Sequence, residues 1–375
     1  MTHHIDMFFA LLRLSLNRGE EYINNSIPVF SHTDNKDWDL LFNLSVRQGV
    51  LLLSYGGLQY LPVKYQPSHK LKLRWCVNVI KGRERYEHYE SVIAKLSNLF
   101  SDNSIDLLII KGITISELYP IPYFRESGDI DIYLSDEAEQ ANELILSLGM
   151  RKEGGIPKHS TFVVEGVPIE NHYTFFDTVL EFKKEGLLYQ KMENILKSML
   201  FEKKRLSPDY DNVSQLSPQA AALHFIGHTF RHFCSLDMNI RQMCDWTMFF
   251  SKYEKNIDIE LLSSQVKELG LEKFVCHINA FCSGYLAFRT YFMHPSEADK
   301  KASEFILKTI MQYRVVPPIH IPVFWVLQYL FRRNIIYKRY LGKVNNSEFL
   351  FPELKSYFKY LFREGWTSIN RKKRA

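Results

Sequence analysis

The chain has 375 residues, of which 46% are hydrophobic and 14% are aromatic. This length is typical of two or three folded domains, and the composition excludes a disordered chain. The formal net charge is only +5, with 47 Lys and Arg against 42 Asp and Glu, so the chain as a whole is not a polycation.

The cysteines and the apolar segments indicate the expected environment. The five cysteines are scattered and form no C-x-x-C pair, which argues against a disulfide framework and for a reducing compartment. Buried free thiols are the favoured interpretation, and a zinc site through His232, Cys234 and Cys244 is a weaker alternative. The N-terminus lacks the basic segment of a signal peptide, and prolines interrupt the most apolar later stretch, residues 315–331. We therefore expect a soluble cytoplasmic protein.

Residues 1–99 are expected to form a helical N-terminal segment. An apolar run covers residues 8–16, and further apolar side chains recur at helical spacing between residues 38 and 46. Residues 70–100 alternate positive and negative side chains, which is typical of one long helix with a solvated face.

Residues 100–205 are expected to form a small α/β core with a mixed sheet. The apolar run 105–110 predicts a buried strand that ends in a turn at Lys111-Gly112. Residues 113–118 then predict a short helix.

The second half of this core continues the alternation of predicted strands and helices. Residues 129–134 predict a second strand, and residues 135–148 predict a helix that begins at the N-cap Ser135. Gly154-Gly155 predicts a turn. A hairpin through Gly166 is then expected from two segments, residues 161–165 and 167–174.

Residues 206–375 are expected to form a larger helical domain. Ser217-Pro218 is a typical helix start. Apolar periodicity predicts helices over residues 218–234, 236–252, 258–269, 271–291, 297–313 and 321–340.

The positive charge is concentrated at the C-terminal end. Residues 331–375 hold twelve Lys or Arg against three Glu, a balance of +9, so the remaining chain carries −4 of the total of +5. A solvated basic helix face explains this most simply, and a weak contact with an anionic surface is the alternative. No long basic stripe lies near the acidic residues discussed next, so the signal for nucleic-acid binding is weak.

The strand predicted at residues 129–134 carries two acids at alternate positions. Residues two apart in a strand point to the same face, so Asp129 and Asp131 project together. The residues between and after them, Ile130, Ile132 and Leu134, then face the core. Two adjacent carboxylates repel one another, and a cation relieves that cost. A hard divalent ion such as Mg²⁺ or Mn²⁺ suits carboxylate ligands and keeps positions open for phosphates.

The predicted hairpin offers a third acid. Glu170 and His172 share one face of its second strand. A carboxylate on a neighbouring strand would complete a two-metal site, which clamps the attacking and leaving oxygens of a phosphoryl displacement. Glu170 is also a candidate base for the acceptor hydroxyl.

Basic residues and a glycine turn surround the acidic pair. Gly112 lets the backbone approach a ligand closely, and Lys111 supplies a point charge for a triphosphate. Arg125, just before the acidic strand, is a candidate for holding phosphate oxygens with both ends of its guanidinium.

Three histidines recur every four residues in the C-terminal part. His224, His228 and His232 therefore line one stripe of a helix. They are interpreted either as a hydrogen-bonded row between helices, or as the lining of a nucleotide cleft, or as metal ligands; the spacing without a glutamate is not a zincin signature. On the next helix Arg241 and Asp245 are four residues apart and are expected to pair.

The stretch from Lys111 to Pro120, together with residues 125–132, resembles the uncharacterised bacterial nucleotidyltransferase family within the polymerase-β-like superfamily. The resemblance extends over roughly residues 30–340, and its specific motifs lie in residues 108–134 and 167–173. Gly112 matches the glycine turn, the acidic pair matches the metal-binding acids, and Glu170 matches the third acid.

This resemblance implies an α+β fold in which a small mixed sheet, the nucleotidyltransferase core, carries N-terminal helices and a larger C-terminal helical domain. It implies transfer of a nucleoside monophosphate from a nucleoside triphosphate, with release of pyrophosphate. The acceptor is open between a sugar, another small molecule, a protein side chain and an RNA end. Asp129, Asp131 and Glu170 are expected to act in catalysis and to hold Mg²⁺ or Mn²⁺. Nucleotide contacts are expected from Lys111, Gly112, Arg125, Gly128, His172 and His228.

Two alternatives stay open at this point. The superfamily turn usually reads Gly-Ser or Gly-Gly, whereas Ile113 follows Gly112 here, which keeps open an inactive nucleotide-binding or interaction module. A metal-dependent phosphodiesterase or nuclease would use the same acids on nucleic acid.

Overall fold

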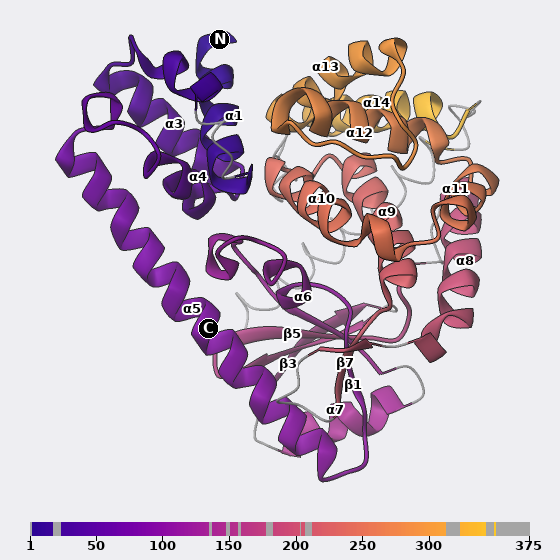
Figure 1. Ribbon diagram of the computed structural model, residues 1–375. Helices are drawn as coiled ribbons and strands as arrows, with labels where there is room; N and C mark the ends of the chain where they lie inside the picture. Colours follow the sequence, from indigo (N-terminus) through magenta and orange to yellow (C-terminus); the bar gives the residue numbers. More distant parts are fainter. Residues whose placement is uncertain are drawn as a thin grey trace.

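The computed structural model describes residues 2–17, 24–134, 137–147, 151–156, 159–177, 183–202, 204–206, 212–312, 323–342 and 349. Helices and one mixed sheet make up the molecule, which confirms the predicted α+β class. Figure 1 shows the sheet at the bottom, with two groups of helices above it.

The N-terminal part is built from α1 (Thr2–Asn17), α3 (Asn35–Arg47) and α4 (Leu51–Leu58). Asp34 caps α3, because its carboxylate accepts hydrogen bonds from the backbone N–H groups of Lys36 and Asp37. The apolar run at residues 8–16 is buried in α1, which packs against α4. The predicted N-terminal helices therefore form because their apolar sides cover one another.

One long helix, α5 (His69–Ser101), runs from the N-terminal helices to the sheet (Figure 1). It confirms the helix predicted over residues 70–100. Trp75, near its start, packs with the N-terminal helices, whereas Leu96 and Phe100, near its end, belong to the core under the sheet. A single helix thus holds the two parts in a fixed relation.

The sheet contains seven strands among the described residues, in the order β3-β4-β5-β2-β1-β7-β6. β2 pairs in parallel with β5, and β1 pairs in parallel with β7, whereas the other neighbours are antiparallel. The sheet is therefore mixed, as predicted, and it continues to Gln215, past residue 205 where the core was expected to end. The strands are β1 (Leu107–Ile109), β2 (Ile130–Tyr133), β3 (Arg151–Ile156), β4 (His159–Val164), β5 (Val167–His172), β6 (Lys204–Arg205) and β7 (Val213–Gln215).

The predicted hairpin is confirmed and one predicted turn is wrong. β4 and β5 are joined by Glu165 and Gly166, whose φ angles of 51° and 84° are those of a two-residue hairpin turn. Gly154-Gly155 does not turn but lies inside β3, where a register shift after Lys152 accommodates the glycines. Ser135, the expected helix cap, lies outside the described residues.

The two faces of the sheet are covered differently. α5 and α7 (Ala138–Ser147) cover one face, where Ile130, Ile132 and Ile169 form a core. The other face turns toward α9 (Pro218–Cys234) and carries the polar side chains described below.

The C-terminal helices agree with the predicted series except at two ends. The helix predicted from residue 236 begins at Ile240, because Leu236 has a positive φ of 58°. The helix predicted to residue 291 ends at Leu286, because Ala287 is left-handed with φ 55°. These helices are α10 (Ile240–Tyr253), α11 (Ile259–Glu268), α12 (Glu272–Leu286), α13 (Glu297–Gln312) and α14 (Val323–Tyr340), and α8 (Lys183–Ser198) precedes α9. Short helices are α6 (Ile113–Ser116) and the 3₁₀ turns Ile27–Phe30, Val63–Tyr65, Pro122–Phe124, Leu200–Glu202 and Glu254–Asn256.

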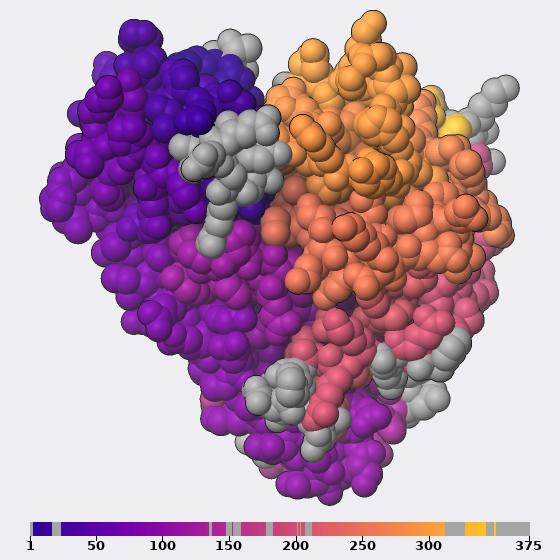
Figure 2. Space-filling model, viewed as in Figure 1, coloured from indigo at the N-terminus to yellow at the C-terminus, as the bar shows by residue number. Residues whose placement is uncertain are grey.

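The N-terminal and C-terminal helices share one core. Phe9 packs against Phe281 with ring centroids 5.9 Å apart, and Arg13 Nη1 donates to the carbonyl of Tyr285 at 2.9 Å. Figure 2 shows the two helical parts side by side above the sheet. Among the described residues, no helix combines the length and apolar character needed to cross a membrane. Most of the basic segment at residues 331–375 lies outside the described residues.

Candidate active site

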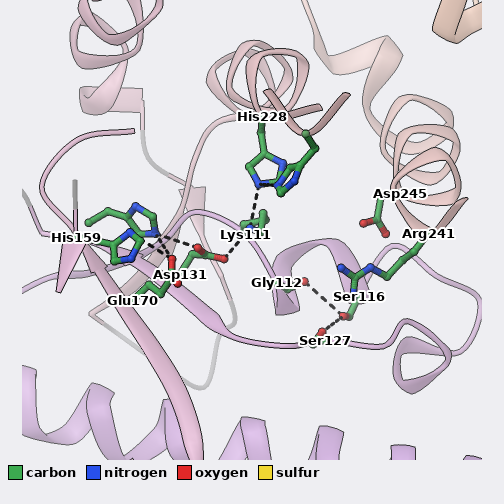
Figure 3. A network of polar contacts seen from close by, with 12 residues as sticks. Lys111, Gly112, Ser116, Ser127, Asp131, His159, Glu170, His228, Arg241 and Asp245 are labelled. Atoms are coloured by element: carbon green, nitrogen blue, oxygen red, sulfur yellow. Dashed lines mark hydrogen bonds and ion pairs between the residues drawn. The ribbon is translucent and has the colours of Figure 1, made fainter. Parts of the chain in front are cut away.

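Two neighbouring strands bring the three predicted acids together. β2 and β5 run in parallel and pair Asp131 with Glu170, so both side chains project from the same face (Figure 3). Asp129 stands directly before β2. One ligand oxygen from each of these acids lies within 4.8 Å of the other two. The register of the sheet, rather than proximity along the chain, therefore creates the cluster.

The alternation predicted for β2 explains why the acids face this side. Ile130 and Ile132 are buried in the core beneath the sheet, so the residue between them must turn to the opposite face. That residue, Asp131, is only 3% exposed. A carboxylate so deeply buried needs neighbours that balance its charge.

Asp131 has two such neighbours. His172 Nε2 lies 2.9 Å from Oδ1, and Lys111 Nζ lies 3.1 Å from Oδ2. Burial alone would raise the pKa of Asp131, but Lys111 and His172 outweigh it and hold the pKa well below its usual value. Oδ2 nevertheless lacks a hydrogen bond of good geometry. This buried oxygen is thus still able to bind a cation.

The pKa values of the other two acids shift in opposite directions. Burial raises the pKa of Asp129, and the neighbouring Asp131 carboxylate raises it further. The imidazole of His172 lowers the pKa of Glu170, whose side chain is 26% exposed. Asp129 is therefore the acid whose negative charge is least balanced by its neighbours, and a divalent cation would balance it.

Helix α9 lies over the acids and contributes two histidines of the predicted row. Lys111 Nζ lies 3.1 Å from His228 Nε2, which lies 3.0 Å from His232 Nε2 (Figure 3). His232 Nδ1 in turn lies 2.7 Å from Asp237 Oδ1. A chain of polar contacts therefore runs from Asp237 through the histidines and Lys111 to Asp131.

The third histidine of the row has different surroundings. The ring of His224 is 5% exposed, and its centroid lies 5.6 Å from those of Phe175 and Phe176. Cys234 and Cys244 are buried free thiols, and no metal-ligand group found among the described residues contains either. His224 thus packs on two phenylalanines and also lines the 260 Å³ cavity with the other two histidines, and the zinc alternative gains no support.

Arg125 is engaged by the protein itself. Its Nε and Nη2 donate to the two carboxylate oxygens of Asp245 at 2.8 and 3.0 Å. Its Nη1 donates to the carbonyl of Gly112 at 3.2 Å and to Ser127 Oγ at 3.0 Å. The guanidinium thus fastens helix α10 to the loop that carries the glycine turn, and the phosphate contact expected of it stays a prediction.

Arg241 faces the site instead. The pair predicted between Arg241 and Asp245 does not form, because the carboxylate takes the bidentate partner Arg125. Arg241 donates through Nη1 to the carbonyl of Glu126, and its buried Nε has no hydrogen-bond partner. An N–H group of this kind at the edge of a cavity is a ready donor for a phosphate oxygen.

The glycine turn has the conformation that its residue type allows. Gly112 has φ 84°, and a Cβ there would lie 3.1 Å from the carbonyl oxygen of Asp129. The turn can therefore approach the acidic strand closely and place Lys111 beside it. Gly128 accepts a hydrogen bond from the hydroxyl of Tyr89 at 2.9 Å through its carbonyl, which holds the loop before β2.

Two adjoining cavities open above the acids. One, of about 260 Å³, is lined by Asp131, Glu170 and His172, and the other, of about 270 Å³, is lined by Arg241 and Arg125. Both are also lined by a shared set of residues, so they form parts of one hollow. The shared residues are Lys111, Asp129, His228, His232 and Asp237.

The sequence analysis missed His159 and Asp237, and it assigned Arg241 to a pair with Asp245 rather than to the site. His159 begins β4 opposite His172, and its Nδ1 lies 3.4 Å from Glu170 Oε2. The sequence did hold a signal, because a two-residue turn at Glu165-Gly166 requires residue 159 to pair with residue 172.

The fold and the site define a protein in which carboxylates from adjacent strands face a hollow lined by basic groups. Residues 34–287 match the model of the uncharacterised nucleotidyltransferase family, and the chain belongs to this family. The matched range contains the acids, Lys111, the histidine row and Arg241. No curated protein and no solved structure gives a significant match.

Proposed function

We propose that this protein is a metal-dependent nucleotidyltransferase that moves a nucleoside monophosphate from a nucleoside triphosphate to an acceptor and releases pyrophosphate. The observation that supports it most is the clustering of Asp129, Asp131 and Glu170 within 4.8 Å beneath Lys111, at the floor of a hollow. Family membership supports the same type of transfer.

The donor set fits a hard divalent cation such as Mg²⁺ or Mn²⁺. All three ligands are carboxylates, and the buried Oδ2 of Asp131 has Lys111 Nζ at 3.1 Å but no hydrogen bond of good geometry. Asp129, Asp131 and Glu170 would hold the cation. When bound, it would neutralise charge on the transferred phosphate and activate the acceptor oxygen.

The basic residues of the hollow are placed to bind the phosphates. The Lys111 ammonium lies at the boundary between the acids and α9, because it contacts both Asp131 and His228. Arg241 lines the adjoining cavity, and its buried Nε has no hydrogen-bond partner among the described residues. We assign triphosphate binding to these three side chains, Lys111, His228 and Arg241, and assign Arg125 to holding the loop.

The reaction forms a bond between the acceptor oxygen and the α-phosphorus and breaks the bond from that phosphorus to the oxygen of the leaving pyrophosphate. The acceptor hydroxyl loses a proton in this step. Glu170 is the candidate base, because its side chain is 26% exposed, against 4% for Asp131, and lines the hollow.

The test is pyrophosphate release from each of the four nucleoside triphosphates with Mg²⁺ or Mn²⁺, with cell extract as the source of acceptor. Asp129→Ala/Asp131→Ala is compared with wild type, and Asp106→Ala, an exposed acid of the same core, is the matched control. We expect release by wild type and control and at least about a 1,000-fold loss in the double variant.

Other outcomes would favour the alternatives. Triphosphate binding without release, in folded protein supplied with extract, would point to an inactive nucleotide-binding module. Metal-dependent cleavage of DNA or RNA, lost in the same double variant, would point to a nuclease.

A further inference from the structure

The β4–β5 hairpin carries three metal-binding side chains on one face. The two-residue turn at Glu165-Gly166 fixes the register, which places His159 directly opposite His172. Glu170, two residues before His172, projects from the same side. The hairpin therefore presents two imidazoles and one carboxylate together, next to the acidic cluster but with a different chemistry.

The distances within this group resemble those of a coordination shell. His159 Nδ1 and His172 Nε2 each lie 3.4 Å from the same oxygen, Glu170 Oε2. Two ligands of a tetrahedral ion with bonds of about 2.1 Å lie about 3.4 Å apart. By contrast, an N–H···O hydrogen bond is usually about 2.9–3.0 Å long. The spacing of both histidines to Glu170 is thus better matched to a shared ion than to two hydrogen bonds to one carboxylate. A bound ion would replace the contact that His172 Nε2 now makes with Asp131 Oδ1 at 2.9 Å.

The burial of the group favours the same interpretation. The side chain of His172 is 2% exposed and that of His159 is 14% exposed, so the surrounding protein holds both rings in place. Their ring centroids lie 5.0 Å apart. All three side chains line the 260 Å³ cavity, so an ion among them would keep a position open toward that cavity.

The ligand types determine which ion fits. Mg²⁺ prefers oxygen ligands and keeps much of its water, whereas imidazole nitrogen suits zinc and its neighbours among the transition metals. We propose that His159, Glu170 and His172 form a binding site for a first-row transition-metal ion of the zinc type. The protein then carries two unlike cations, a hard ion on the carboxylates and a zinc-type ion on the hairpin.

Glu170 is a ligand both in the proposed carboxylate site and in the zinc-type site. Because of this shared ligand, the arrangement of two cations rests on the proposed function. Asp131 also links the two sites, because its Oδ1 lies 2.9 Å from His172 Nε2. Two-metal sites of phosphoryl-transfer enzymes share carboxylates in this way, with the ions about 3.5–4 Å apart. Here the second ion would be selected by nitrogen ligands that the acidic cluster alone does not provide.

The experiment is a Zn²⁺ titration of the metal-free full chain, without a histidine tag and in the presence of excess Mg²⁺. Binding is followed by calorimetry and by metal analysis after gel filtration. Wild type is compared with His159→Gln and Asp129→Asn, and His69→Ala removes an exposed histidine as the control. Circular dichroism checks the fold of each variant, and His172→Gln tests the same ligand set should His159→Gln be unstable.

We expect wild type and His69→Ala to bind one equivalent of Zn²⁺ despite the Mg²⁺. His159→Gln should weaken that binding by more than the roughly 10–100-fold that follows the loss of a supporting hydrogen bond to a ligand. Asp129→Asn should retain it. The proposal is overturned if wild type binds no Zn²⁺ under these conditions, or if folded His159→Gln and His172→Gln bind it as wild type does.

Because no nucleotide is present, this result is independent of turnover. Pyrophosphate release with Mg²⁺ alone, combined with no retained Zn²⁺, would keep the proposed function and reject the zinc-type site. Retained Zn²⁺ without any release would do the reverse.

Discussion

Two buried ion pairs of this protein differ in how completely their charges are satisfied. Arg125 and Asp245 are 5% and 3% exposed, and they meet through two parallel hydrogen bonds. Asp245 also accepts a hydrogen bond from the hydroxyl of Tyr119 at 2.7 Å. The remaining donors of the guanidinium reach a carbonyl and a serine hydroxyl. Such a pair is a closed structural unit.

The pair between Lys111 and Asp131 is open by comparison, because its hydrogen bonds are incomplete. The Lys111 side chain is 20% exposed and also contacts His228, and Asp131 Oδ2 lacks a hydrogen bond of good geometry. Two more acids, Asp129 and Glu170, add negative charge that no single lysine can balance. Both charges of the first pair are thus bound within the protein, whereas the second pair keeps a carboxylate oxygen without a well-formed hydrogen bond. This contrast supports a structural role for the first pair and the proposed ligand-binding role for the second.

The largest expected effect is on the open pair. Asp131→Asn should lower nucleotidyl transfer by at least about 1,000-fold, because it removes a metal ligand and a charge from the reacting centre. The free energy of unfolding should fall as well, because the low pKa of Asp131 means that Lys111 and His172 stabilise its ionised form in the folded protein. Initial rates of pyrophosphate release and urea denaturation measure the two quantities. Full turnover in the variant would show that Asp131 is not a ligand.

Breaking the closed pair between Arg125 and Asp245 should lower the stability of the fold. Asp245→Ala leaves the Arg125 charge buried without its partner, which costs about 3–5 kcal/mol of stability. Glu87→Ala, which breaks the exposed pair with Arg83, is the control and should leave stability nearly unchanged, because solvent screens that pair. Urea denaturation compares the variants. A loss of under about 1 kcal/mol in Asp245→Ala would mean that the buried pair does not hold the fold.

These two pairs also mark what the sequence could predict. The acids of β2 were predictable because Ile130 and Ile132 fix which face is buried, and the alternation of a strand does the rest. The strand that carries Glu170 was predictable because the hairpin turn is encoded locally by Gly166. Its pairing with Asp131 was not, because that contact comes from the parallel register of β2 and β5, which no local pattern specifies.

The closed pair could not be predicted in the same way. Arg125 and Asp245 are 120 residues apart, and their contact depends on how α10 docks against the loop before β2. Local spacing favoured Arg241 as the partner of Asp245, and the bidentate geometry available to Arg125 overrides that preference. The packing of α9 over the sheet places His228 above Lys111, so the roof of the site also follows from tertiary packing.

A smaller effect is expected from the arginine that the closed pair leaves free. Arg241→Ala should raise the KM for the nucleoside triphosphate by about 10–100-fold with a much smaller change in kcat, because a phosphate contact made in both ground and transition states is lost. Arg241→Lys should recover part of the loss through its charge. An equal fall in kcat and kcat/KM would instead assign Arg241 to the transition state.

The smallest effect concerns a third buried group, which avoids the cost of an unbalanced charge by staying neutral. His277 Nδ1 and the hydroxyl of Tyr340 form a hydrogen bond of 2.8 Å. Asp299 Oδ1 lies 3.4 Å from the other ring nitrogen, His277 Nε2. Burial, together with the positive charges of Arg339 and Lys273, lowers the pKa of His277 from 6.5 to about 4 against the attraction of Asp299.

Between those two pKa values the unfolded chain binds a proton that the folded protein does not, so stability falls as the pH drops through that window. The shift is expected to cost about 1–2 kcal/mol between pH 7 and pH 4.5, after allowance for partial solvation. Urea denaturation at both pH values should therefore show a smaller acid loss in His277→Gln than in wild type. If both proteins lose stability equally, His277 has an ordinary pKa in the folded state. The folded protein would then balance a charge on His277 as it balances the charges of the two ion pairs.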